Sequence, residues 1–279
     1  MAIEVIDCPY CGSSEYSAWA EERGFTTVRC RCGLLYVNPR PTPDSIHAAV
    51  STGIHAEEAE GLNAIARRDG PKVARYRSIF SRMFADVWAR REPISWLDVG
   101  AGYGEVVEAV VGLAPAGSRV EGLEPMHPKA AEARRRGLTV EEDYLRSTHA
   151  KVGFISSINV FSHIPDYGGF LSDVRDVLLP RGELFIETGN LADLDDRNSF
   201  PGSLGVPDHL VFAGMNHIRG FLDRSGFDIV KVEQVRSDDV LNFAKNIVKR
   251  ILRPRVSYSI GLPYTSPYRQ LMVRARLRQ

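Results

Sequence analysis

Hydrophobic positions change their period along this chain, and the changes divide it into elements. From Pro71 to about Arg91 apolar residues recur at helical spacing, which predicts one long amphipathic helix. Short apolar runs and helical patterns alternate after it. The runs predicted as strands are Ile94–Val99, Arg119–Glu124, Leu138–Glu142, Val152–Val160, Glu183–Thr188, Phe227–Val235 and Gln270–Leu277. The patterns predicted as helices are Glu105–Leu113, Pro128–Arg136, Tyr167–Leu179 and Asn216–Ser225.

This alternation predicts an α/β fold with a doubly wound, mostly parallel seven-stranded sheet. The last two strands are joined by the segment 237–267, and we expect them to form an antiparallel edge. In such sheets a ligand lies at the carboxyl ends of the strands, where the strand order reverses beside the first strand. The candidate site is therefore made of the residues that follow the strands.

The first predicted strand runs directly into a glycine-rich turn and then a helix. Gly100, Gly102 and Gly104 alternate in this turn. Glycine permits left-handed backbone angles and the close approach of a ligand, and the first amides of the following helix point to the same place. The arrangement is typical of a nucleotide-binding site, but its G-x-G-x-G spacing differs from the G-x-G-x-x-G of dinucleotide binding.

Acidic residues at the strand ends complete this site. Asp98 ends the first strand beside the turn. Glu124 ends the second strand, where a carboxylate can accept hydrogen bonds from both hydroxyls of a ribose. Glu142 or Asp143 ends the third strand, near the expected position of an adenine amino group.

All four cysteines lie in the first 32 residues, as the close pairs Cys8 with Cys11 and Cys30 with Cys32. This layout is that of a zinc ribbon, in which four thiolates complete a closed structural site. The second pair is C-x-C, so we expect its knuckle to be distorted; free buried thiols are the alternative. The proline-rich run 37–43 predicts a stiff linker after the module.

These features suggest three regions. Residues 1–42 form the zinc-ribbon module with its proline-rich linker, residues 43–92 a helical lid or connector, and residues 93–279 the ligand-binding domain.

Several of these segments together resemble a known family. Leu97–Gly104 is similar to the first motif of class I S-adenosylmethionine-dependent methyltransferases, Glu124 to their ribose-binding acid, and Leu178–Thr188 to the helix, turn and strand before their fifth strand. Residues 32–41 resemble the zinc-ribbon-headed methyltransferases of bacterial sugar, surface-glycan and natural-product pathways. The resemblance covers about residues 71–277 and the front module.

The resemblance implies S-adenosylmethionine as methyl donor and zinc as a structural ion. The candidates for binding the donor are then Asp98, Gly100, Gly102, Tyr103, Gly104, Glu124, Glu142, Asp143 and Asn159. Tyr103 would cover the methionine portion, with simple packing as its alternative role. The candidates for binding zinc are Cys8, Cys11, Cys30 and Cys32.

The catalytic candidates implied by the resemblance are two histidines. His163 lies just beyond the fourth strand, where related sugar C-methyltransferases carry a Glu-His pair implicated in proton removal; this chain has Ser162 before the histidine. His209 is the second candidate, and Asp208 beside it could orient its ring. Backbone hydrogen bonding or positioning is the alternative role for each. The other histidines lie in contexts typical of a surface.

We therefore expect an S-adenosylmethionine-dependent O-methyltransferase that acts on a sugar, nucleotide-linked or part of a glycan or glycosylated natural product. C- or N-methylation of a small molecule is the alternative. A degenerate methyltransferase fold that binds a partner is a rival, favoured by Ser162 and by Gly153, where an aspartate usually opens the fourth strand. The glycine spacing argues against a nicotinamide-dependent oxidoreductase.

Composition bounds location and partners. No apolar run reaches the roughly 18 residues of a membrane-spanning helix, and the N-terminus lacks a signal-peptide pattern, so we expect a cytoplasmic protein. A formal net charge of zero argues against broad binding of nucleic acid. From Val240 onward the chain has no acidic residue and is basic at Lys245, Lys249, Arg250, Arg253, Arg255, Arg269, Arg274, Arg276 and Arg278.

This basic segment has three interpretations. It can be a solvated face balanced by acidic regions elsewhere. It can contact an anionic membrane surface. It can also recognise a phosphorylated acceptor, in which case we expect Arg253 or Arg255 to contribute.

Overall fold

The computed structural model describes residues 1–52, 70–194, 197, 200, 202–236, 240–252 and 268–279. The large sheet contains β6 (Ser95–Val99), β7 (Arg119–Leu123), β8 (Val140–Glu141), β9 (Val152–Ile158), β10 (Leu178–Gly189), β12 (Phe227–Arg236) and β13 (Tyr268–Leu277). Its helices are α2 (Gly70–Met83), α3 (Ala85–Trp88), α4 (Glu105–Val111), α5 (His127–Arg135), α6 (Tyr167–Val177) and α7 (Met215–Arg224).

The strand order of this sheet is β12-β13-β10-β9-β6-β7-β8. β13 runs antiparallel to both of its neighbours, and the pairs from β10 to β8 are parallel. The predicted seven-stranded, mostly parallel sheet with an antiparallel edge is therefore confirmed. β6 lies in the middle of the parallel strands, so the segment that follows it emerges where the strand order reverses.

Helices cover both faces of the sheet. Side chains of α6 and α7 pack on one face in the largest hydrophobic cluster, and side chains of α2, α3 and α4 pack on the other. Trp96 of β6 lies at the centre of the second layer, fully buried, with its ring centroid 5.3 Å from that of Phe154. Its indole N–H donates to Ser156 Oγ at 2.9 Å, which connects this core to the strand ends described below.

The predicted single helix 71–91 is two helices. The chain leaves helical geometry at Phe84 (φ −121°, ψ 28°), between α2 and α3. Its ring is buried and lies 4.9 Å from Trp96 between centroids. Burial of this aromatic side chain against the core accounts for the break, which the hydrophobic period does not reveal.

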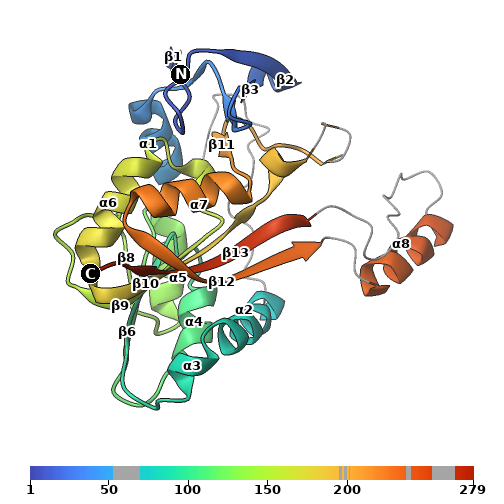
Figure 1. Ribbon diagram of the computed structural model, residues 1–279. Helices are drawn as coiled ribbons and strands as arrows, with labels where there is room; N and C mark the ends of the chain where they lie inside the picture. The colour runs from blue at the N-terminus through green and yellow to red at the C-terminus, as the bar shows by residue number, and fades with distance from the viewer. Residues whose placement is uncertain (53–69, 195–196, 198–199, 201, 237–239, 253–267) are drawn as a thin grey trace.

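A smaller unit, here called the head, precedes the large sheet. It contains β1 (Ile3–Glu4), β2 (Tyr16–Glu22), β3 (Phe25–Cys30), β4 (Leu35–Val37) and β5 (Arg40–Pro41), followed by α1 (Pro43–Thr52). Figure 1 shows the head at one end of the molecule, with α2 and α3 toward the opposite end.

The head and the large domain share a sheet. Its order is β11-β4-β3-β2, with every pair antiparallel, and β11 (Val211–Phe212) comes from the far end of the chain. The large domain thus supplies one edge strand of the head.

The predicted stiff linker at 37–43 is wrong, because most of this segment is built into the head. Arg40–Pro41 pairs with Ile3–Glu4 as a two-stranded sheet. Asn38 is buried, and its side-chain amide exchanges two 3.1 Å hydrogen bonds with the backbone of Ile6. Proline excludes helix here, as expected, but it does not leave the segment free of the head.

Other boundaries differ by a few residues. The third predicted strand shortens to Val140–Glu141, and the helix before β10 ends at Val177. One helix, α8 (Val240–Leu252), was not predicted from the sequence. Among the described residues, no helix is both long and apolar enough to cross a bilayer.

Candidate active site

The glycine turn after β6 has the geometry that its sequence predicts. Gly100, Gly102 and Gly104 have φ values of 73°, 56° and 79°. A Cβ at Gly100 would lie 2.4 Å from Val160 Cγ2, and one at Gly104 would lie 2.6 Å from Leu138 Cδ1. At Gly102 the nearest such atom is 3.9 Å away. The outer two glycines therefore allow the turn to pack, and Gly102 faces space that a ligand can approach.

Glu124 is held against this turn. Its carboxylate is buried and accepts hydrogen bonds from Gly102 N at 2.7 Å and from Met126 N at 3.0 Å, one on each oxygen. Each carboxylate oxygen has a second lone pair. The predicted acid thus lies beside the open glycine with acceptor capacity left for two ribose hydroxyls.

Asp98 forms the floor of the same region. Ser156 Oγ donates to Asp98 Oδ1 at 2.5 Å and itself accepts from the indole of Trp96. Burial raises the pKa of Asp98 to about 8; the nearby Glu124 and Glu105 act in the same direction, while the bond from Ser156 opposes them. Asp98 therefore retains a proton well above the pH at which an exposed carboxyl ionises.

The two acids at the end of β8 are both engaged. His127 Nδ1 lies 2.6 Å from Glu142 Oε2, and Asp143 Oδ1 accepts from Tyr144 N at 2.8 Å. Both acids follow β8, the strand that pairs with β7, and Glu124 follows β7, as expected. Which of them would meet an adenine stays a prediction.

Tyr103 and Asn159 lie at the same crest of the sheet. Tyr103 is half-buried, and its hydroxyl has no hydrogen-bond partner among the described residues. Asn159 is exposed at φ 55°, and its N–H donates to the carbonyl of Glu187. Glu187 was not predicted: it is fully buried and ion-paired with Arg75 of α2. Their roles toward a cofactor stay predictions.

His163 lies in a short 3-10 helix, η1 (Phe161–His163), directly after β9. Its Nδ1 is 2.9 Å from the carbonyl oxygen of Asp208 and 3.1 Å from Asp208 Oδ1. Both atoms are acceptors, so the hydrogen-bond network assigns a proton to Nδ1. Asp208 therefore supplies, from a distant segment, the carboxylate that Ser162 does not provide.

His209 is next to this pair. Its ring centroid lies 4.7 Å from that of His163, and its Nδ1 is 2.7 Å from the Leu204 carbonyl. Burial lowers the pKa of His209, and the neighbouring His163 lowers it further. The structure thus brings both predicted histidines together. Asp208 is hydrogen-bonded to the ring of His163, whereas the ring of His209, which Asp208 was expected to orient, is hydrogen-bonded to Leu204.

Backbone hydrogen bonds connect this histidine pair to the head. Leu210 N donates to Ser162 O at 2.6 Å, and Val37 N of β4 donates to Leu210 O at 2.8 Å. The side chain of Arg40 donates to the Pro165 carbonyl at 2.9 Å. The head therefore contacts both segments that carry the histidines.

Glu22, at the end of β2, holds the turn before His209. Its carboxylate accepts from Ser203 Oγ at 2.6 Å, Leu204 N at 2.8 Å and Gly205 N at 3.0 Å. Burial opposes ionisation of Glu22, but these three hydrogen bonds prevail and lower its pKa. No local sequence pattern could predict this contact, because 181 residues separate Glu22 from Ser203.

The four cysteines gather as predicted, and no disulfide joins them. The Sγ atoms of Cys8 and Cys32 lie 3.7 Å apart, and those of Cys11 and Cys30 lie 3.5 Å apart. Tetrahedral zinc with bonds of about 2.3 Å places its sulfur ligands about 3.8 Å apart. The donor set and its spacing fit zinc, despite the C-x-C pair. Burial raises the pKa of Cys8, and that of Cys32 to about 11, so a bound cation would displace their protons.

The interpretation of His217 as a surface residue is wrong. It is 6% exposed, and its Nε2 donates to the Cys32 carbonyl at 3.0 Å. The Tyr10 ring lies edge-on to it at 4.9 Å. His217 thus joins the second cysteine pair to α7.

Several residues of the basic C-terminal segment have specific partners. Arg274 is buried between Asp86 and Glu183, and Arg276 pairs with the same Glu183. Arg278 pairs with Asp223 and Asp228. These three arginines fix β13 to its surroundings. Arg253 and Arg255, expected to contact a phosphate, lie outside the described residues.

Comparisons with known proteins agree with this geometry. A family described as "methyltransferase domain" matches residues 67–232. A curated relative, the ubiquinone biosynthesis O-methyltransferase of Actinobacillus pleuropneumoniae serotype 7 (strain AP76), is 32% identical over 108 residues, which are 34% of this chain. The match spans 45% of that relative's length.

Solved structures share the fold at low identity. One, from Galdieria sulphuraria, is named for a candidate sarcosine dimethylglycine methyltransferase; it is 17% identical with a TM-score of 0.55, covering 77% of this chain and 92% of its own. The cyclopropane synthase MmaA2 of Mycobacterium tuberculosis is 13% identical with a TM-score of 0.50, covering 84% of this chain and 94% of its own.

Proposed function

The chain belongs to the class I S-adenosylmethionine-dependent methyltransferases, and from this premise we propose that it methylates a hydroxyl of a sugar or of a glycosylated small molecule. The observation that carries the proposal is the pair formed by His163 and Asp208 at the end of β9. A hydroxyl is a poor nucleophile, and a positioned base contributes about 10²–10⁴-fold to such a reaction.

On the donor side, the protein mainly has to align the methyl group with the attacking atom. Bound at the glycine turn, S-adenosylmethionine supplies a methyl group that its sulfonium already activates for in-line displacement. In this proposal Glu124 accepts hydrogen bonds from the ribose hydroxyls, and Gly102 leaves room for the ligand beside it. Asp98 supports the turn from below.

On the acceptor side, His163 Nε2 takes the proton of the attacking hydroxyl. Asp208 accepts the hydrogen bond from Nδ1, fixes the ring and stabilises the imidazolium as it forms. His209 is a neutral neighbour that positions the ring or contacts the acceptor. Burial and the proximity of His163 both keep it uncharged.

We also propose that zinc is the ion held by Cys8, Cys11, Cys30 and Cys32, with a structural role. A closed set of four thiolates leaves no open position for a substrate. Its effect on the reaction is indirect, through the head's contacts with Leu210 and with the turn at 203–205.

A sugar acceptor is supported by the resemblance of the head to those of methyltransferases in sugar pathways. O-methylation is supported by the similarity to the ubiquinone biosynthesis O-methyltransferase. Methylation at carbon would use the same base, and the position of the new methyl group distinguishes the two.

The test is a methyl-transfer screen with isotope-labelled donor against nucleotide-linked sugars and glycosides, read by mass spectrometry. The proposal expects a labelled product whose methyl group NMR places on oxygen, and loss of that product with His163→Ala. A methyl group on nitrogen or carbon, or full activity of His163→Ala, would contradict it.

A further inference from the structure

Helix α8 has one apolar side and one basic side. The apolar side contains Ala244, Ile247, Val248 and Ile251. Each is three or four residues from at least two of the others, which places all of them on one side of the helix. Val248 is 53% exposed and Ile251 is 73% exposed. Leu252, at 74%, continues this apolar side at the end of the helix.

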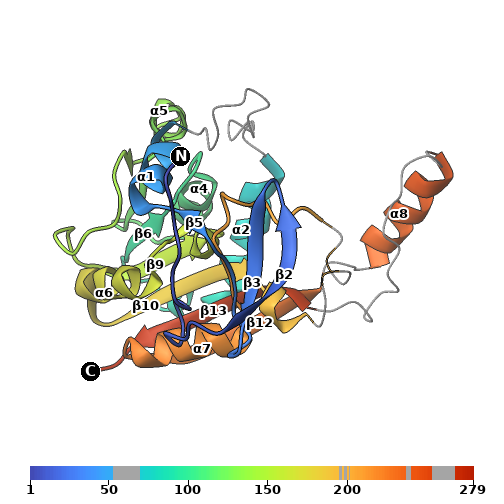
Figure 2. The same ribbon diagram turned by 90° about the horizontal axis from the view of Figure 1, so that it is seen from above.

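Within the described part of the molecule all of these side chains are exposed except Ile247, which is half-buried. Figures 1 and 2 show α8 standing away from both the sheet and the head. Contiguous exposed apolar residues on a helix are unfavourable in water and mark an interaction surface. We name Ala244, Ile247, Val248, Ile251 and Leu252 the α8 patch.

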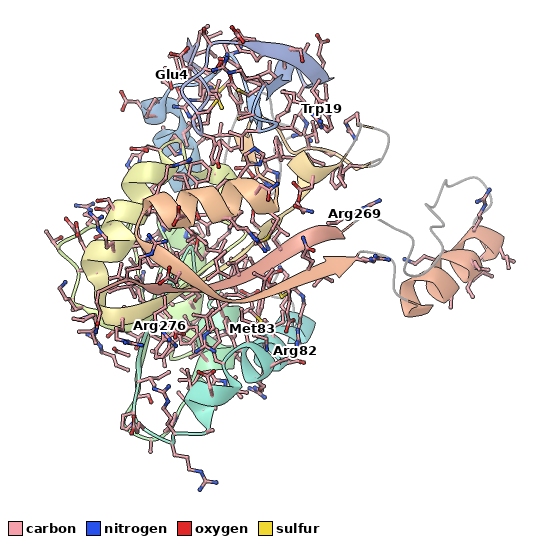
Figure 3. All side chains as sticks on the ribbon, in the orientation of Figure 1. Glu4, Trp19, Arg82, Met83, Arg269 and Arg276 are labelled. Atoms are coloured by element: carbon pink, nitrogen blue, oxygen red, sulfur yellow. The ribbon has the colours of Figure 1, made fainter. Side chains whose placement is uncertain are left out.

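Charge restricts what can cover the α8 patch. Lys249 and Arg250 are exposed on the other side of the helix, and the chain has no acidic residue from Val240 to Gln279. Arg276, which pairs with Glu183, lies on the body of the molecule, far from α8 (Figure 3). Lys249 and Arg250 therefore form a basic surface that is separate from Arg276.

A second copy of the chain is a poor partner for this helix. Two α8 patches in contact would cover only the apolar sides, and Lys249 and Arg250 of both copies would face away from the contact. A surface that is both apolar and anionic satisfies both sides of the helix at once. An anionic lipid bilayer is such a surface.

The dimensions agree with a helix that lies on a bilayer. Thirteen helical residues extend about 20 Å, which is shorter than the hydrocarbon core of about 30 Å. We propose that α8 binds in the headgroup region of an anionic membrane, with the α8 patch toward the acyl chains and Lys249 and Arg250 toward lipid phosphates. This proposal is independent of the acceptor and of the base.

The test is sedimentation of the full-length protein with vesicles of phosphatidylcholine alone or with phosphatidylglycerol added. We expect at least tenfold stronger binding to the anionic vesicles, weakened by salt. The double variant Lys249→Glu, Arg250→Glu should bind the anionic vesicles more weakly, by about fivefold or more for each basic residue removed. Ile251→Asp should reduce this binding by at least tenfold, because it places a charge in the apolar side.

Val5→Asp is the matched control, since Val5 is 74% exposed and lies in the head. It should bind vesicles like the wild type, and all variants should keep their affinity for S-adenosylhomocysteine, which shows that they are folded. Equal binding to both vesicle types would overturn the proposal. So would self-association that Ile251→Asp abolishes in a protein that ignores vesicles, because the patch would then bind a second copy.

Discussion

The donor side and the acceptor side of the site are built in different ways. On the donor side, the bond from Gly102 to Glu124 joins residues 22 apart, at the ends of adjacent strands. On the acceptor side, 45 residues separate His163 from Asp208, and 181 separate Glu22 from Ser203. The donor side is therefore a local product of the large sheet, whereas the acceptor side requires the head.

Because of this difference, we expect donor binding and acceptor turnover to be lost through different substitutions. Changes in the head should alter the position of the histidines and leave the glycine turn as it is, since no described hydrogen bond joins the head to Gly100–Gly104 or to Glu124. The following predictions test this separation, in order of decreasing effect.

Removal of the proposed zinc ion has the largest expected effect. A structural zinc contributes most of the folding free energy of a small module, so a strong chelator should unfold the head. Without β4, the segment 203–212 loses its partners. Hydrogen exchange should then accelerate there and at the head, but not at residues 95–105. Equal acceleration at residues 95–105 would show that the two sides form one cooperative unit.

His163→Ala should lower turnover by about 10²–10⁴-fold, because it removes the base. Affinity for S-adenosylhomocysteine should stay within about twofold, since the ring makes no contact with Glu124 or the glycine turn. Single-turnover methyl transfer, once an acceptor is known, measures the first quantity, and calorimetry the second. If His163→Ala lowered only the affinity for the donor, His163 would belong to the donor side, which would contradict the account.

Glu22→Gln should lower turnover by several-fold. The amide replaces a carboxylate that accepts three hydrogen bonds and thereby holds the turn that positions His209. Glu21→Gln, on the exposed neighbour, should behave like the wild type. Kinetics of the three proteins side by side give the answer. If both variants lose the same activity, the effect comes from the charge of the head and not from the turn.

The last prediction concerns the donor side alone, namely how the effect of Asp98 on the free energy of unfolding depends on pH. The folded state raises the pKa of Asp98 from 3.8 to about 8, so its favourable contribution is complete below pH 3.8 and is lost as the pH rises toward 8. Relative to the wild type, Asp98→Asn should therefore gain stability as the pH rises from about 5 to about 8, by up to about 1.4 kcal/mol per pH unit. Denaturant unfolding at several pH values measures this gain. A difference that does not change with pH would contradict the account.

The donor side could be predicted from the sequence because its signals are local. A buried strand, alternating glycines and an acid at the end of the next strand fix Gly102 and Glu124 beside each other. The clustering of the four cysteines was predictable for the same reason, because the cysteines occur in two close pairs along the sequence.

The acceptor side could be predicted only in part. The sequence singled out both histidines, whose roles stay predictions, but it did not indicate that Asp208 contacts His163. That contact depends on the segment before β11 returning to η1. Glu22 and the buried His217 gave no signal at all. The prediction of a linker at 37–43 was wrong because proline indicates a stiff backbone but does not indicate which surface the segment packs against.

The most direct test of the separation is calorimetric titration with S-adenosylhomocysteine of the wild type, Glu124→Ala and Glu22→Gln. The account predicts that Glu124→Ala weakens binding at least tenfold, because two charge-assisted hydrogen bonds to the ribose are lost. Glu22→Gln should bind within about twofold of the wild type. Weak binding by Glu22→Gln, or wild-type binding by Glu124→Ala, would contradict a donor site built by the large sheet alone.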